Sequence, residues 1–217
     1  MRPADWASLA STVREAPSRG ARVLVVTGAG SAFCAGADVT DISVEEMAEQ
    51  VERAFEAVRQ VPLPVIAQVN GAAVGAGLQL VVSCDLRVVA SAGRFRLPAA
   101  AISLPVHPGT ICRLVALAGM GPARAILLGG DWISAERALA LGLGDRLGDL
   151  DDAVSWAEEI ASFAPLVLRY FKAQLQVPQP ADSSGYERTF AEILSSEDFA
   201  EFTRSRAEGR SPRYIGR

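Results

Sequence analysis

The sequence is poor in cysteine, histidine and lysine. Its three cysteines, Cys34, Cys84 and Cys112, are odd in number and widely spaced, so they support neither a disulfide framework nor a zinc site. Lys172 is the only lysine and the formal net charge is −4, which gives no electrostatic reason to bind nucleic acid. The apolar runs fall far short of the roughly 20 residues that span a bilayer, and no signal-peptide pattern is present. We therefore expect a cytoplasmic protein with no membrane span and no nucleic-acid partner.

The order of the predicted elements indicates an α/β core followed by a helical region. Strands are predicted at 22–27, 65–69, 85–90, 94–97 and near 144–147. Helices are predicted at 5–16, 43–60, 109–129 with interruptions at Gly119 and Gly121, 135–141 and 149–163, and along a tail at 165–209 that breaks around 176–184. Segments 31–41 and 70–77 are predicted as a loop and a glycine-rich turn. The expected division is a core at 1–150 and a helical oligomerisation region at 151–217.

Two loops bring backbone amides to the ends of predicted buried strands. They are the segments 33–38 (F-C-A-G-A-D) and 75–78 (G-A-G-L), and their small side chains let a ligand approach the main chain. Two amides that converge on one oxygen would polarise a thioester carbonyl. The alternative interpretation is that both segments are only tight turns, since glycine turns are common.

The motifs around these loops resemble the crotonase (enoyl-CoA hydratase/isomerase) superfamily over nearly the whole chain. The resemblance is carried by segments 22–38, 64–77, 84–90, 132–147 and 197–206 in that order. It implies an α/β fold with a crotonase (ClpP-like) β-β-α spiral core and a helical C-terminal trimerisation region. It also implies a homotrimer or a hexamer, a fatty acyl-CoA ligand, and no cofactor beyond the coenzyme A of that ligand. Family members usually open with a strand hairpin before the first helix; here Arg2-Pro3 stands almost at the start, so either the hairpin is absent or the given start is late.

The resemblance also assigns roles to individual residues. It gives the oxyanion hole to the amides of Ala37 and Ala76 and lets Phe202 and Arg206 reach a neighbour's coenzyme A. The other substrate-binding residues that it implies are Ala35, Asp38, Val39, Thr40, Gly75, Gly77, Pro98, Ile102 and Leu104.

The sequence departs from the hydratases at both positions that activate water. Matching on Cys84-Asp85 places Gln79 at the first glutamate position and Ala99 at the second. Glutamine cannot take a proton and alanine cannot hold a water. No Asp or Glu occurs between Asp85 and Asp131, so no other carboxylate of that segment can substitute. We therefore assign no catalytic residue and do not expect hydratase activity.

Three further groups are alternative candidates for chemistry. His107, the only histidine, lies in the segment that the resemblance places at the rim of the acyl pocket, where it could act as a base. Cys34 lies beside the first oxyanion amide, although a nucleophilic role needs a base nearby. Gly28-Ala29-Gly30 follows a predicted strand, but Phe33 stands where a dinucleotide fingerprint has its third glycine.

Three hypotheses follow for the function. The first is a catalytically silent acyl-CoA carrier or sensor that resembles silent actinobacterial members of the family. The second is an active enoyl-CoA isomerase or hydratase that uses an unorthodox base such as His107. The third is a non-catalytic structural or regulatory subunit of other crotonase-fold proteins.

Overall fold

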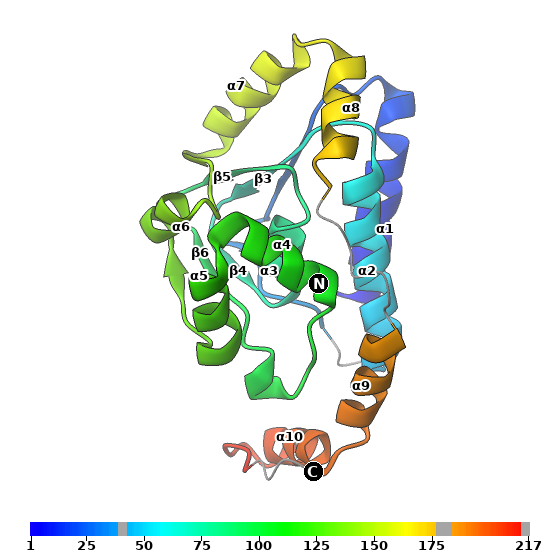
Figure 1. Cartoon of the computed structure of the whole chain (residues 1–217), viewed down its shortest axis with the longest axis vertical. Helices are drawn as coiled ribbons and strands as arrows, with labels where there is room; N and C mark the ends of the chain where they lie inside the picture. Colours follow the sequence, from blue (N-terminus) through cyan, green and yellow to red (C-terminus); the bar gives the residue numbers. More distant parts are fainter. Residues whose placement is uncertain (39–42, 177–183, 214–217) are drawn as a thin grey trace.

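The computed structural model describes residues 1–38, 43–176 and 184–213, and it contains two four-stranded sheets with helices around them (Figure 1). The first sheet has the order β1-β3-β5-β8 and is parallel throughout. The second has the order β2-β4-β6-β7, with only the β6–β7 pair antiparallel. The strands are β1 (Leu24–Thr27), β2 (Ala32–Cys34), β3 (Val65–Val69), β4 (Ala72–Val74), β5 (Leu86–Val89), β6 (Arg94–Arg96), β7 (Ile133–Ser134) and β8 (Arg146–Leu147).

The helices alternate with pairs of strands, so that each turn of the chain adds one strand to each sheet. The predicted α/β architecture is confirmed. The α-helices are α1 (Pro3–Glu15), α2 (Val44–Gln60), α3 (Ala76–Val81), α4 (Pro108–Ala118), α5 (Met120–Arg124), α6 (Ala135–Leu141), α7 (Leu150–Ala161), α8 (Pro165–Gln174), α9 (Ser184–Leu194) and α10 (Glu197–Ala207). Short 3-10 turns at Pro17–Arg19 and Ala100–Ile102 and a π-helical turn at Ala125–Gly129 complete the described elements.

Helix α2 shows how the sequence specifies its own ends and its buried face. Ser43 accepts a hydrogen bond from the Glu46 amide, and Glu46 accepts one in return from the Ser43 amide, a capping box that satisfies two amides at the helix start. The apolar residues recur at helical spacing and face α1, where Phe55 meets the fully buried Trp6 edge to face at 5.7 Å between ring centroids. Burial of two such large side chains stabilises this side of the core by about 2–3 kcal/mol each.

Two short strands lie where only a loop and a turn are predicted. β2 falls within 31–41 and β4 within 70–77, and each has three residues. Strands this short show no alternation in the sequence, and their pairing with neighbours supplies the hydrogen bonds that define them. Gly119 separates α4 from α5 as predicted, whereas Gly121 lies inside α5 and interrupts nothing. The break predicted around 176–184 lies mostly outside the described residues.

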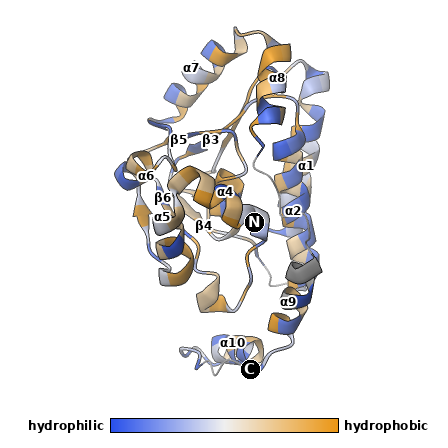
Figure 2. Ribbon diagram, in the orientation of Figure 1, coloured by the Kyte–Doolittle hydropathy of each residue, from blue (hydrophilic) through white to orange (hydrophobic). Residues whose placement is uncertain are grey.

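The C-terminal region begins with α7 and α8, which pack against the first sheet. Ala153 and Ile160 of α7 join a small apolar cluster with Ile66 and Val88 of that sheet, and Figure 2 shows that much of α8 is also hydrophobic. Five large apolar side chains of α8 and its end remain exposed: Leu166, Val167, Tyr170, Phe171 and Leu175. Within the described residues no helix is long and apolar enough to cross a bilayer.

Helix α8 is attached to the core through the only lysine of the chain. The Lys172 ammonium lies 2.7 Å from Asp85 Oδ2 and donates to the carbonyl oxygens of Val58 and Leu63, each at 2.9 Å. Asp85 also accepts from the Val65 amide at 2.8 Å, so that one carboxylate links β3, β5 and α8. The Lys172 side chain is only 7% exposed, which makes this a buried ion pair with most of its hydrogen bonds satisfied.

The substitution Lys172→Met should lower the free energy of unfolding by about 3 kcal/mol, because it leaves the Asp85 carboxylate and two carbonyl groups without their buried donor. Urea unfolding measures the change. Arg169→Met, an exposed position on the same helix, serves as the control and should change stability by less than about 0.5 kcal/mol. Equal stability of the two variants would show that the ion pair does not hold α8.

Candidate functional site

The parallel strands β2, β4 and β6 end at one edge of the second sheet and bring three loops together there. β2 pairs with β4 through Cys34 and Ala73, and β4 pairs with β6 through Val74 and Arg96. The segments 35–37, 75–77 and 97–99 leave the sheet directly after these pairs. The carboxyl ends of parallel strands are where ligands commonly bind in α/β proteins.

The first two loops touch because Gly77 has no side chain. A Cβ built on Gly77 would lie 2.1 Å from the Cys34 carbonyl oxygen, a distance that no real contact allows. Gly75, which precedes α3, has a φ of +57° that favours glycine, and its amide donates to the Arg96 carbonyl at 3.0 Å. This arrangement fixes the start of α3 against both neighbouring strands.

Ala37 and Ala76, the predicted oxyanion residues, have amides that donate to no acceptor among the described residues. Ala76 is buried at the first position of α3, and Ala37 is half-buried in the adjacent loop. The Met1 backbone holds that loop on both sides of Ala37: its nitrogen donates to the Gly36 carbonyl at 2.7 Å, and its carbonyl accepts from the Asp38 amide at 2.8 Å. Within the described residues, neither amide is used by the protein itself, so both remain able to donate to a ligand.

Gln79 lies on α3, one turn after Ala76, and is bonded to a residue that the sequence did not single out. Its Oε1 accepts from the Thr110 hydroxyl of α4 at 3.3 Å, and its main-chain carbonyl accepts from the Ser83 hydroxyl at 2.8 Å. Thr110 is fully buried. The only sequence signal for it was its place three residues after His107 on a predicted helix. The pair contains no group that titrates near neutral pH.

The segment 98–106 forms a small apolar wall beside these loops. Pro98, Ala99, Ile102 and Leu104 are all half-buried. The Leu104 amide donates to the Ala99 carbonyl at 3.0 Å, which closes the 3-10 turn, and Ala99 packs on the same core as Ala37. The position that the resemblance assigns to the second glutamate therefore carries a methyl group in an apolar surface.

His107 caps α4 rather than pointing an open lone pair at the loops. Its Nδ1 accepts from the Gly109 amide at 3.1 Å, which assigns the proton of the neutral ring to Nε2. Burial lowers the pKa of His107, the Arg113 and Arg59 guanidinium groups lower it further, and the Glu52 carboxylate opposes them. No carboxylate lies near this ring in the sequence, and Glu52 reaches it from α2. A neutral capping histidine with Nδ1 engaged is poorly placed to act as a base.

Cys34 is buried beside the first loop. Burial raises the pKa of its thiol, and the Sγ–H group donates weakly to the Gly36 carbonyl at 3.8 Å. A protonated, buried thiol is not a nucleophile, so its environment favours the packing role.

Other residues assigned by resemblance lie outside this cluster. Val39 and Thr40 fall outside the described residues, and Ala35 and Asp38 are exposed on the first loop. Phe202 and Arg206 are on α10, which Figure 1 shows at the far end of the molecule, away from the sheets. The chain's own α10 therefore does not complete its own site.

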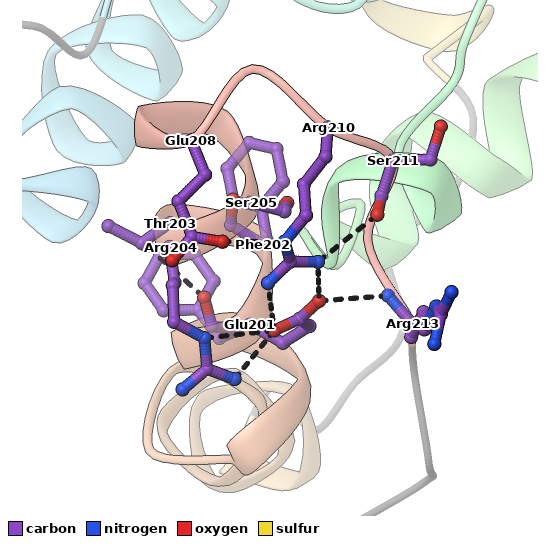
Figure 3. A network of polar contacts seen from close by, with 10 residues as sticks. Glu201, Phe202, Thr203, Arg204, Ser205, Glu208, Arg210, Ser211 and Arg213 are labelled. Atoms are coloured by element: carbon purple, nitrogen blue, oxygen red, sulfur yellow. Dashed lines mark hydrogen bonds and ion pairs between the residues drawn. The ribbon is translucent and has the colours of Figure 1, made fainter.

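Helix α10 is stabilised by a network around Glu201 (Figure 3). The Glu201 carboxylate accepts from Arg210, Arg204 and the Arg213 amide. Hydrogen bonds from Arg210 and then Arg204 hold the pKa of this carboxyl well below its usual range. The network folds residues 210–213 back onto the helix, and Phe202 packs against Phe199 with 6.1 Å between ring centroids.

The loops, the sheet edge and the two amides define a protein of the crotonase fold. A sequence model of the family "Enoyl-CoA hydratase/isomerase" matches residues 9–217, and the chain belongs to this family. It is 38% identical over 211 residues to "Probable enoyl-CoA hydratase echA6" of Mycobacterium tuberculosis, a match that covers 96% of this chain and 87% of that protein.

Solved structures agree with this assignment. An enoyl-CoA hydratase/isomerase from Pseudoalteromonas atlantica superposes with a TM-score of 0.82 at 26% identity, over 99% of this chain and 90% of that chain. Methylmalonyl CoA decarboxylase complexed with 2S-carboxypropyl CoA superposes with a TM-score of 0.84 at 22% identity, over 96% of this chain and 88% of that chain. The crotonase fold that the motifs predict is confirmed.

The substitution Gly77→Ala should destabilise the protein by about 1–3 kcal/mol, because the new methyl group would force the Cys34 carbonyl away and separate the two loops. Gly121→Ala is the matched control: a Cβ there meets nothing within 4 Å, and alanine in a helix is about 1 kcal/mol more favourable than glycine. The unfolding temperature should fall for Gly77→Ala and rise for Gly121→Ala, each relative to the wild type. A shift of the same sign would contradict the close approach at Gly77.

The depressed pKa of His107 predicts a stability that depends on pH below neutrality. The unfolded state binds a proton at pH values near 6.5, where the folded state still keeps the ring neutral, so stability is complete above about pH 6.5 and declines as the pH falls toward the folded pKa. Urea unfolding of the wild type and of His107→Gln between pH 5 and 8 checks this. The difference between the two proteins should change below pH 6.5, and a constant difference would contradict the assigned environment.

Proposed function

We propose that this protein binds fatty acyl-CoA thioesters through the amides of Ala37 and Ala76 and does not hydrate them. The observation that carries the proposal is the pair of amides without protein acceptors on two loops that Gly77 holds in contact. A thioester oxygen that accepts from both would be polarised, and each such donor contributes on the order of 3 kcal/mol where charge develops on the oxygen. The chain would then act as a carrier or sensor of acyl-CoA, as its resemblance to silent actinobacterial members suggests.

The side chains at the two assigned glutamate positions support the non-catalytic part of the proposal. Hydration needs a group that takes a proton from water within hydrogen-bond reach. The two positions of the family glutamates hold an amide bonded to Thr110 and a methyl group. Glu52, the carboxylate near His107, is engaged with Arg59 at 2.6 Å. An acyl chain against Pro98, Ala99, Ile102 and Leu104 would gain apolar contact and no proton transfer.

The second hypothesis, an isomerase with His107 as base, is less well supported. The ring would need to release the Gly109 amide before Nδ1 could accept a proton. The third hypothesis, a purely structural subunit, does not account for the two amides that have no acceptor among the described residues. A direct binding and turnover measurement separates all three.

The assembly is the second part of the proposal. A homotrimer or a hexamer would cover the exposed apolar side chains of α8. It would also allow Phe202 and Arg206 of α10 to reach a neighbour's coenzyme A. In this arrangement residues 1–150 form the binding core and residues 151–217 the oligomerisation region.

Ala76→Pro should weaken acyl-CoA binding at least tenfold, because proline removes one amide donor while fitting the first position of a helix. Isothermal titration with butyryl-, decanoyl- and palmitoyl-CoA measures the affinities, and a crotonyl-CoA hydration assay measures turnover. Leu150→Pro makes the same change at the first position of α7 and should leave binding unchanged.

The outcomes separate the hypotheses. Wild-type binding without turnover that is lost in Ala76→Pro supports the carrier function. Turnover abolished by His107→Gln would replace it with the isomerase or hydratase. Absence of acyl-CoA binding by the folded wild type would leave the structural subunit.

A further inference from the structure

A cavity of about 420 Å³ lies near the end of α3 that is opposite to the Ala76 amide. Val82, Ser83 and Cys84, which follow α3, form part of its wall, and the starts of β3 and β5 form its floor. Apolar side chains of α4, α7 and α8 line the rest, Leu117, Trp156, Ile160 and Leu168, together with Phe163 and Leu175, which are themselves exposed to solvent. The volume lies within the range of about 300–1,000 Å³ that small-molecule sites occupy.

Four basic side chains line this apolar cavity, and three of them have a carboxylate partner. The nitrogen–oxygen distances are 2.6 Å for Arg59 with Glu52, 2.8 Å for Arg87 with Asp145 and 2.7 Å for Lys172 with Asp85. The fourth is Arg113 of α4, which forms no ion pair and no side-chain hydrogen bond with any residue that the structure describes. The cavity therefore carries one positive charge in excess of its carboxylates.

Arg113 is 6% exposed, and its Nε and Nη2 atoms are both buried without a partner. Arg113 lines the cavity, and a guanidinium group can take both oxygens of a carboxylate side by side. Burial and the neighbouring Arg59 guanidinium together lower the pKa of Arg113 to about 10, and the Glu52 carboxylate opposes them. Arg59 Nη1 and Arg87 Nε are also buried and unpartnered. A buried charge with unmade hydrogen bonds is costly unless a bound anion completes it.

We propose that this cavity binds the carboxylate of an unesterified fatty acid, with the carboxylate on Arg113 and the chain against the apolar wall. One excess positive charge matches a monoanion and leaves a phosphate dianion or a nucleotide undercompensated. Cys84 also lines the cavity and adds no charge, because burial raises the pKa of its thiol to about 12. The proposal does not depend on acyl-CoA binding at the Ala37 and Ala76 amides.

Isothermal titration with decanoate and with decanol, which has the same chain length without the charge, tests the site. The wild type should prefer decanoate by at least tenfold, and the affinity for shorter carboxylates should fall about threefold to fourfold for each methylene removed. Arg113→Met should abolish the preference and, without ligand, should unfold at the same temperature as the wild type or higher, since it removes an uncompensated charge. Arg137→Met, at an exposed position on α6, should retain the wild-type preference.

A second variant keeps the test independent of Arg113. Leu168→Trp would narrow the cavity while leaving every cation in place, and it should weaken decanoate more than butyrate. Titration in saturating palmitoyl-CoA should leave decanoate binding unchanged. The proposal is wrong if the wild type binds no decanoate, if palmitoyl-CoA displaces it competitively, or if Arg113→Met keeps the preference for the charged ligand.

Discussion

The close approach of Gly77 to the Cys34 carbonyl is the constraint on which the site depends. It brings the first turn of α3 against the end of β2, and every other relation at the sheet edge follows from it. The Cys34 carbonyl occupies the space that a side chain on residue 77 would need, so the close approach of the two loops requires glycine there. Sites built on rigid elements hold their donors more precisely than sites on loops alone. The positions of the Ala37 and Ala76 amides are therefore a property of the backbone and do not require any particular side chain.

This separation of backbone and side-chain roles explains how the fold can persist when the side chains around the two amides change. The two amides are main-chain groups, whereas Gln79 and Ala99 contribute only their side chains to the surroundings of the amides. Gln79 remains tied to Thr110 and so keeps the packing between α3 and α4. Polarisation of a carbonyl and activation of water are thus physically separable functions.

Much of the architecture could be predicted from the sequence, because the relevant signals are local. The capping box at Ser43 and the apolar spacing along α2 fix that helix, and the buried run at 65–69 fixes β3. The spacing to Cys84-Asp85 was enough to place Gln79. β2 and β4 were missed because three residues carry no period and their pairing partners lie about 40 positions away. Thr110, Arg113 and Glu52 were missed for a related reason: each acquires its neighbours from an element distant in the chain, and a single sequence does not record such contacts.

The position of the only lysine also affects the chemical reactivity of the protein. Lys172 directs its ammonium at one carboxylate oxygen and two carbonyls and is 7% exposed, and the sequence offers no other ε-amine. Thioesters acylate accessible amines, and apart from His107 the other basic side chains here are guanidinium groups that stay protonated at physiological pH. A thioester bound as proposed would therefore meet no accessible lysine that it could acylate.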